Sequence, residues 1–127
     1  TISCVDWVSG AAMLIRRKCF EDLRGFDQGF FMYCEDVDIC KRAHQQGWQV
    51  MYYPMLKFTH HIGGSIKRES IKSILWHHRS MMRFYFKHYR VNCFWDAAVC
   101  LGIMFRAAYH IIFSVLGALL RIGRAHG

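Results

Sequence analysis

The sequence predicts an α/β fold in its first part and long amphipathic and apolar helices after it. Short apolar runs of strand length stand on both sides of a helical segment at residues 35–46. Later, apolar residues recur at helical intervals between lysines and arginines, and the last third of the chain is mostly apolar. We therefore expect an α/β segment at 1–66, a basic amphipathic helix at 67–92 and an apolar, membrane-associating helical tail at 93–127.

The first segment is expected to contain extended runs joined by a loop. Residues 7–17, WVSGAAMLIRR, form a short apolar run closed by two arginines and are predicted to be a buried strand preceded by a Gly-containing bend. FEDLRGFDQGFF, residues 20–31, is predicted to be a loop because its glycines and acidic residues break any long periodicity. Residues 48–53 alternate like a strand that stops before Pro54, and 56–59 give a further short extended run.

The helix predicted at residues 35–46 carries signals at both ends. Glu35, Asp36 and Asp38 crowd its first turn, where negative charge is favourable, and basic residues come later. Gly47 follows as a C-cap.

Helical character returns after the glycines at 63 and 64. Ser65 or Ser70 is expected to cap a long helix that runs to about Tyr89. The tail from 97 to 120 approaches the length of about 20 apolar residues that spans a bilayer, but Arg106 and His110 interrupt it. A helix in the membrane interface, with its basic side toward lipid phosphates, fits this pattern best. A tilted span and burial against the protein are the alternatives.

Composition indicates an anionic partner and an apolar environment. The chain of 127 residues has a net charge of +8, and 54% of its residues are hydrophobic. This charge suits phosphate groups or an acidic membrane face. The sequence contains six cysteines but no CxxC pair, and most lie in apolar runs, so they are predicted to be reduced in a cytosolic protein.

The acidic cluster Glu35, Asp36 and Asp38 has two interpretations. Carboxylates that only cap a helix would each contribute about 0.3 to 1 kcal/mol. The aromatic run at residues 30–33, directly before the cluster, instead suggests that one carboxylate starts its helix at the wall of an apolar pocket. Desolvation there would make it a usable general base.

A second motif, FTHHIGGS at residues 58–65, combines paired imidazoles with a glycine turn. His60, or alternatively His61, could ligate a divalent metal at the end of a strand. Backbone N–H groups of Gly63, Gly64 and Ser65 could approach phosphate oxygens.

These motifs together resemble a known family. The order GAAMLIRR, GFDQGFFMYCEDVDICKRAHQQGW and YYPMLKFTHHIGGS resembles the C-terminal half of the catalytic domain of family 2 glycosyltransferases, especially bacterial rhamnosyltransferases of O-antigen and cell-wall assembly. The resemblance covers about residues 5 to 90. It implies part of a GT-A fold and inverting sugar transfer.

The resemblance also implies roles for individual residues. Asp36 corresponds to the general base, with Glu35 orienting the base or the acceptor, and a histidine matched best to His60 joins a Mg²⁺ or Mn²⁺ site. Acceptor binding is assigned to Trp7, Ser9, Gly10, Asp38 and Arg42, with Arg42 also paired to the acidic cluster. Gly63, Gly64 and Ser65 form the phosphate loop.

The implied substrates are a nucleotide-diphosphate sugar, dTDP-rhamnose, and a lipid-linked saccharide at the cytoplasmic side of the bacterial inner membrane, where the protein would be peripheral. The family's nucleotide-binding half and its DxD motif have no counterpart here, so we expect a fragment that is inactive alone and has an uncovered apolar face. The alternative is a small membrane-associated structural or interaction protein. A nucleic-acid partner is not predicted, because the aromatics between the basic residues of 67–90 fall on several helix faces.

Overall fold

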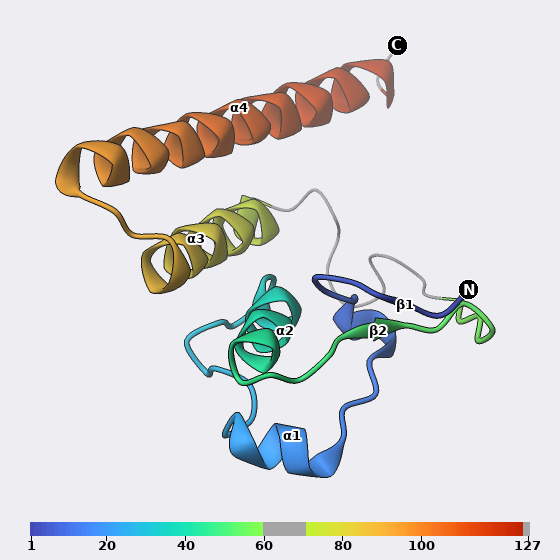
Figure 1. Ribbon diagram of the computed structural model, residues 1–127. Helices are drawn as coiled ribbons and strands as arrows, with labels where there is room; N and C mark the ends of the chain where they lie inside the picture. Colours follow the sequence, from blue (N-terminus) through green and yellow to red (C-terminus); the bar gives the residue numbers. More distant parts are fainter. Residues whose placement is uncertain (60–70, 126–127) are drawn as a thin grey trace. The chain divides into compact units, whose positions relative to one another are not determined.

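The computed structural model describes residues 1–59 and 71–125, with side chains described up to residue 117. The chain forms two compact units, Thr1–His61 and Ile62–Gly127, and each is described by itself (Figure 1). The elements of the first unit are β1 (Ser3–Cys4), the 3-10 helix η1 (Gly10–Ala12), α1 (Arg17–Asp22), α2 (Glu35–Gln45) and β2 (Met51–Tyr52). The second unit contains α3 (Ile71–His88) and α4 (Cys93–Ala125).

The core of the first unit forms around α2. The helix buries Ile39, Cys40 and Ala43 against Cys19 and Leu23, and Val50 completes the cluster. Full burial of a leucine, isoleucine or valine side chain contributes roughly 1.5–3 kcal/mol to the free energy of folding. The apolar positions of α2 recur at helical spacing, so the sequence pattern fixes which face of the helix is buried.

The end of α2 is as predicted. Gly47 has a φ of +80°, a conformation that glycine adopts without a steric penalty. The N–H of Gly47 donates to the carbonyl of His44 at 3.0 Å, and the N–H of Trp48 donates to the carbonyl of Ala43 at 2.9 Å. These bonds satisfy carbonyls that have no partner inside the helix, which explains why the helix stops here.

The predicted strand at residues 7–17 is wrong. Residues 7–9 form no helix or strand, and η1 follows, capped by Ser9, which accepts the N–H of Ala11 at 3.3 Å. The chain then runs extended up to Arg16, the N-cap of α1. Among the described residues, the sheet contains only β1 and β2, which pair antiparallel with Ser3 opposite Tyr52. The extended run forms no strand because none of the described residues supplies it with a neighbouring strand.

The predicted loop at residues 20–31 is also wrong at its start. Residues Arg17–Asp22 form the short helix α1, with ion pairs from Arg17 to Glu21 at 2.8 Å and from Lys18 to Asp22 at 3.4 Å. Pairs spaced by four residues support a helix by a few tenths of a kcal/mol each. The run predicted at 56–59 forms no strand.

An apolar groove of about 530 Å³ opens into the core of the first unit. It lies between the extended run at 13–16, α2 and the residues that lead into β2. Its lining includes the core residues Cys19, Leu23, Ile39, Cys40, Ala43 and Val50. These six core residues are each only 2–8% exposed, and the expected uncovered apolar face stays a prediction.

In the second unit, α3 and α4 form a helical hairpin that Asp96 closes. This side chain is only 6% exposed and accepts hydrogen bonds from the Tyr85 hydroxyl at 2.9 Å, the Arg90 Nε at 3.2 Å and the Val91 N–H at 3.3 Å. Both helices were predicted, and their presence is confirmed. The predicted caps Ser65 and Ser70 lie outside the described residues.

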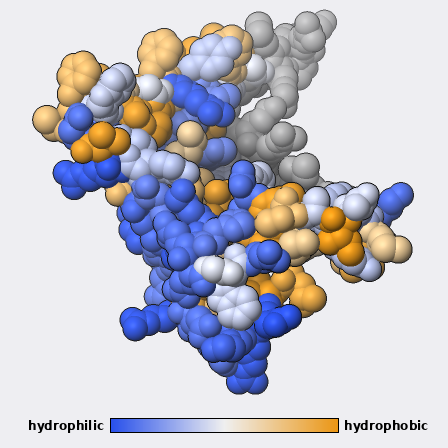
Figure 2. Space-filling model, in the orientation of Figure 1, coloured by the Kyte–Doolittle hydropathy of each residue, from blue (hydrophilic) through white to orange (hydrophobic). Residues whose placement is uncertain are grey.

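One stripe of α4 is shielded and the other faces are exposed. The shielded positions follow helical spacing: Asp96, Val99, Cys100, Ile103, Ala107, Ile111, Ser114 and Gly117. Around them apolar side chains are open to solvent, including Phe105 at 79% and Leu101 at 66% exposed, and Figure 2 shows such side chains along the described part of α4. By length and composition the segment Cys93–Gly117 could cross a membrane, with a mean hydropathy of 1.8.

Candidate active site

The carboxylate of Asp36 joins two elements that are far apart in the sequence. Its Oδ2 accepts the N–H of Gly10 at 2.9 Å, and its Oδ1 accepts the N–H of Val37 at 2.8 Å. A Cβ on residue 10 would lie 3.3 Å from the Asp36 Cβ, so glycine permits this close approach. The two bonds fix the plane of the carboxylate and leave lone pairs on both oxygens, since a carboxylate offers about four acceptor sites.

The chain enters α2 through a tight reversal. Tyr33 has a φ of 67° and Cys34 a φ of 64°, both in the left-handed region. Such a conformation costs a non-glycine residue of the order of 1–3 kcal/mol and is found most often at functional sites. Cys34 is the N-cap but makes no side-chain capping bond, so the Asp36 carboxylate satisfies one of the free N–H groups of the first turn.

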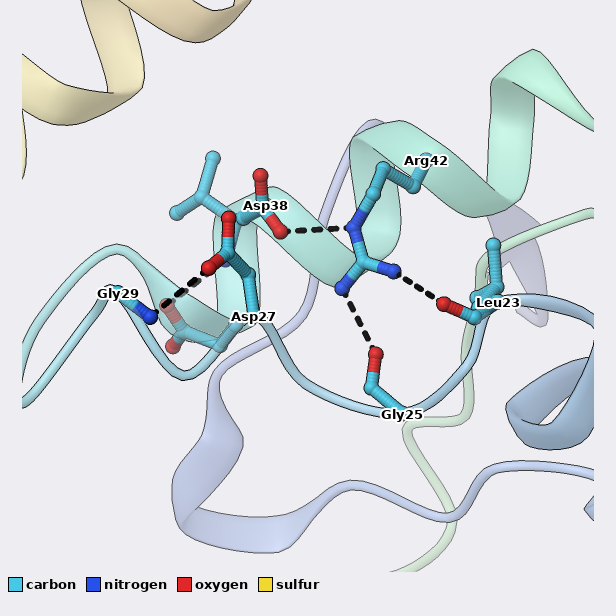
Figure 3. Close-up of polar contacts among 8 residues, drawn as sticks. Leu23, Gly25, Asp27, Gly29, Asp38 and Arg42 are labelled. Carbon is cyan, nitrogen blue, oxygen red and sulfur yellow. Dashed lines mark hydrogen bonds and ion pairs between the residues drawn. The ribbon is translucent and has the colours of Figure 1, made fainter.

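Asp38 and Arg42 hold the first turn of α2 in place (Figure 3). The Asp38 side chain is fully buried, and its Oδ2 accepts from the Arg42 Nε at 2.7 Å. The two remaining nitrogens of the guanidinium donate to the carbonyls of Leu23 at 2.8 Å and Gly25 at 2.9 Å. The predicted pairing of Arg42 with the acidic cluster is therefore confirmed, and the pair connects α2 to the loop that follows α1.

Glu35 lies beside Asp36 at the start of the helix. Its Oε2 is buried and has no hydrogen-bond partner among the residues that the structure describes. An acceptor atom in this state costs about 1–3 kcal/mol until a donor reaches it. Glu35 therefore offers an unused acceptor next to the fixed carboxylate of Asp36.

Cys34 provides a test of the electrostatics of this cluster. Burial, followed by the charges of Asp36, Glu35 and Asp38, raises the pKa of the Cys34 thiol to about 11. We expect its rate of alkylation by iodoacetamide to keep rising up to about pH 11, because only the thiolate reacts, whereas an ordinary thiol levels off above about pH 8.5. Asp36→Asn should move the curve to lower pH. A curve for Cys34 that levels off near the ordinary value would contradict this arrangement of charges.

The structure brings some of the predicted site residues together. Ser9 and Gly10 lie in and beside η1, against Asp36, and Trp7 lies just upstream and is 50% exposed. The acceptor-binding roles of these residues, and of Asp38 and Arg42, stay predictions. His60, His61, Gly63, Gly64 and Ser65 lie outside the described residues.

No metal site is present within residues 1–59 and 71–117 themselves. Their His, Cys, Asp and Glu side chains form no group of three or more that could hold a metal ion. The six cysteines form no disulfide in the structure, and their reduced state in a cytosolic protein stays a prediction. Sequence reasoning missed the carbonyls of Leu23 and Gly25 as partners of Arg42, because no side-chain pattern marks a backbone acceptor.

Comparisons with known proteins identify the family of this chain. The family described as glycosyltransferase like family 2 matches residues 2–85. Rhamnosyltransferase WbbL of Escherichia coli K12 is 39% identical over 80 residues, covering 63% of this chain and 30% of that protein. N-acetylglucosaminyl-diphospho-decaprenol L-rhamnosyltransferase of Mycobacterium tuberculosis H37Rv is also 39% identical over 80 residues, covering 63% of this chain and 26% of that protein.

A more distant relative is the O-antigen biosynthesis protein RfbC of Myxococcus xanthus, 33% identical over 68 residues, covering 52% of this chain and 5% of that protein. The chain thus spans 30% or less of the length of these curated relatives. No solved structure matches it significantly. Because the family match extends over more than half of its residues, the chain belongs to glycosyltransferase family 2.

Proposed function

We propose that this chain carries the acceptor side and the general base of an inverting rhamnosyltransferase that acts on a lipid-linked saccharide in the synthesis of a cell-surface polysaccharide. One observation carries the proposal. Two backbone N–H groups, from Gly10 and Val37, orient the Asp36 carboxylate at the first turn of α2 in a chain of family 2. The rhamnosyltransferases that match the chain supply the class of sugar and acceptor.

In the proposed reaction, Asp36 takes the proton of an acceptor hydroxyl while that oxygen attacks the anomeric carbon of the donor sugar. The bond between this carbon and the nucleotide diphosphate breaks on the opposite face, so the anomeric configuration inverts. A positioned base of this kind accelerates the step about 10²- to 10⁴-fold. The donor is proposed to be dTDP-rhamnose.

Neighbouring residues are proposed to position the acceptor. The buried Oε2 of Glu35 can accept a hydrogen bond from an acceptor hydroxyl, which would give this oxygen the donor that the described residues do not supply. Trp7 and Ser9 would line the acceptor side near Gly10. Asp38 and Arg42 would act indirectly, by fixing the helix turn that carries Asp36.

The metal requirement is part of the proposal. A Mg²⁺ or Mn²⁺ ion would offset the charge of the leaving diphosphate, with His60 or His61 among its ligands and Gly63, Gly64 and Ser65 near the phosphates. The described residues form no metal site alone, so the remaining ligands would come from outside them. We propose that activity also requires the part of the longer relatives that this chain does not match.

The proposed location is the cytoplasmic side of the bacterial inner membrane, with the chain bound peripherally to an anionic surface. Support comes from the exposed apolar faces of α4 and from basic side chains on α3. A helix that presents apolar and basic surface together binds in the plane of a membrane interface. The same features also suit the second candidate function, a membrane-associated interaction protein without catalysis.

The test uses a chimera in which residues 2–85 replace the matching segment of Escherichia coli WbbL. Purified chimera is incubated with dTDP-rhamnose and N-acetylglucosaminyl-diphospho-polyprenol, and the lipid product is identified by mass spectrometry. We expect one rhamnose to be added by the chimera and none by the chain alone. Lack of transfer by a folded chimera, with the parent enzyme active, would favour the interaction protein.

A further inference from the structure

A cluster of three histidines and one arginine lies along the α3–α4 hairpin, away from Asp36 in the sequence. It consists of His77 and His78 on α3 and Arg106 and His110 on α4, and we call it the hairpin cluster. The ring of His78 lies 5.5 Å from that of His77 and 5.9 Å from that of His110, measured between ring centroids. Arg106 is close enough to affect the protonation of His77. All four side chains belong to the second unit.

His78 has an unused nitrogen inside this cluster. The residue is only 7% exposed, and its Nδ1 lies 2.7 Å from the carbonyl of Ile74, to which it donates. In the neutral ring the Nε2 then carries the lone pair. This Nε2 is buried and has no hydrogen-bond partner among the described residues. If the ring is protonated, both nitrogens donate, and the Nε2 N–H needs an acceptor.

No acidic side chain neutralises the cluster from within the described hairpin. α3 contains no Asp or Glu, and α4 contains only Asp96. The carboxylate of Asp96 is already engaged by Tyr85, Arg90 and Val91 near the turn of the hairpin. Arg106 is exposed and makes no hydrogen bond or ion pair with a described residue. A guanidinium midway along an apolar helix is costly unless it meets water or an anion.

The surroundings of the cluster favour an anion that is carried by a lipid. Exposed apolar side chains of α4, such as Phe105, Tyr109 and Phe113, surround Arg106 in the sequence. The exposed positions of α3 include four basic residues, Lys72, Arg79, Arg83 and Lys87. They are separated by seven, four and four positions along the sequence. The hairpin thus presents both an apolar surface, which can contact acyl chains, and positive charge, which can bind lipid headgroups.

We propose that the hairpin cluster binds the diphosphate group of a lipid-linked saccharide, with Arg106, His78 and His110 donating hydrogen bonds to its oxygens. The inference deepens the proposed function, on which it rests for the class of lipid. A diphosphate suits the cluster better than a phosphodiester, because it carries more negative charge and more acceptor oxygens for a guanidinium and several imidazoles. Binding here would hold the lipid end of the acceptor.

The protonation of the cluster gives this site a pH dependence. Burial lowers the pKa of His77, and the neighbouring positive groups His78, Arg106 and His110 lower it further. A bound anion stabilises the protonated form of the imidazoles and so raises their proton affinity. Binding of the anion is therefore accompanied by proton uptake. The affinity for a diphosphate is therefore expected to rise as the pH falls below about 6.5, because the pKa of His77 lies below the ordinary imidazole value.

The experiment measures binding of the full chain to phosphatidylcholine vesicles that contain either a polyprenyl diphosphate or phosphatidylglycerol at equal surface charge. We expect the wild type to prefer the diphosphate vesicles, and Arg106→Gln to reduce this preference about tenfold. Arg79→Gln, on the exposed side of α3, is the matched control and should weaken both kinds of binding by a similar factor. Circular dichroism checks that both variants keep their helices.

The proposal is overturned if the wild type shows no preference between the two vesicles, or if Arg106→Gln keeps the wild-type preference. A second readout uses the wild type alone. The imidazole titration of His77, followed by NMR in phosphatidylcholine micelles, should move about one pH unit upward when the diphosphate lipid is added. An unmoved titration would also overturn it. Because these measurements need no catalysis, their outcome is separate from the transfer assay of the chimera.

Discussion

Asp36→Asn is expected to lower the rate of rhamnosyl transfer about 10²- to 10⁴-fold in the chimera that carries residues 2–85. An asparagine has nearly the same shape but cannot take a proton from the acceptor hydroxyl. Asparagine has one side-chain oxygen that accepts hydrogen bonds, where aspartate has two. One of the two hydrogen bonds from the N–H groups of Gly10 and Val37 is therefore lost. That loss should reduce the free energy of unfolding by about 0.5–1.5 kcal/mol, too little to unfold the domain.

The measurement is the initial rate of product formation at saturating donor and acceptor, with the melting temperature of each variant recorded beside it. Asp22→Asn is the matched control, since Asp22 is an exposed carboxylate of α1 that pairs only with Lys18 at 3.4 Å in the described chain. We expect this control to keep the parent rate. If Asp36→Asn retains the rate of the parent chimera, Asp36 is not the base and its carboxylate only closes the helix start.

Arg42→Met is expected to reduce the free energy of unfolding by about 3–5 kcal/mol, because it removes the guanidinium that pairs at 2.7 Å with the fully buried Asp38 carboxylate. The carbonyls of Leu23 and Gly25 also lose their donors. Methionine keeps most of the side-chain volume, so the loss reports the charge and the hydrogen bonds rather than a cavity. Urea denaturation followed by circular dichroism measures it.

The exposed pair between Arg17 and Glu21 provides the comparison. Its side chains are 92% and 61% exposed, so Arg17→Met should change the free energy of unfolding by less than about 1 kcal/mol. Arg42→Lys should fall between the two, since a lysine keeps the charge but cannot form the three-way fork. Equal effects of Arg42→Met and Arg17→Met would show that the buried pair is not what fixes the start of α2.

Local sequence signals predicted α2, α3 and α4 but not α1. The acidic first turn and Gly47 marked the two ends of α2, and helical spacing of apolar residues marked α3 and α4. The same rules failed at residues 7–17, where an apolar run suggested a strand. A strand requires a partner, and pairing is a property of distant parts of the chain, so the run became η1 and an unpaired extended segment. Membership of family 2 implies part of a GT-A fold, although the described chain is mostly helical.

The sequence by itself determined that three carboxylates begin one helix, because this follows from residues close together along the chain. It also determined the glycosyltransferase family, because the family match depends on the order of residues over 2–85. Only the tertiary structure showed that these carboxylates have different surroundings. Asp36 accepts a hydrogen bond from Gly10, which is 26 positions away in the sequence. Buried Asp38 instead pairs with Arg42. Arg42 also donates to the carbonyls of Leu23 and Gly25, which are 19 and 17 positions from it. The environment of a carboxylate depends on burial and on such distant donors, and neither can be read from its neighbours in the sequence.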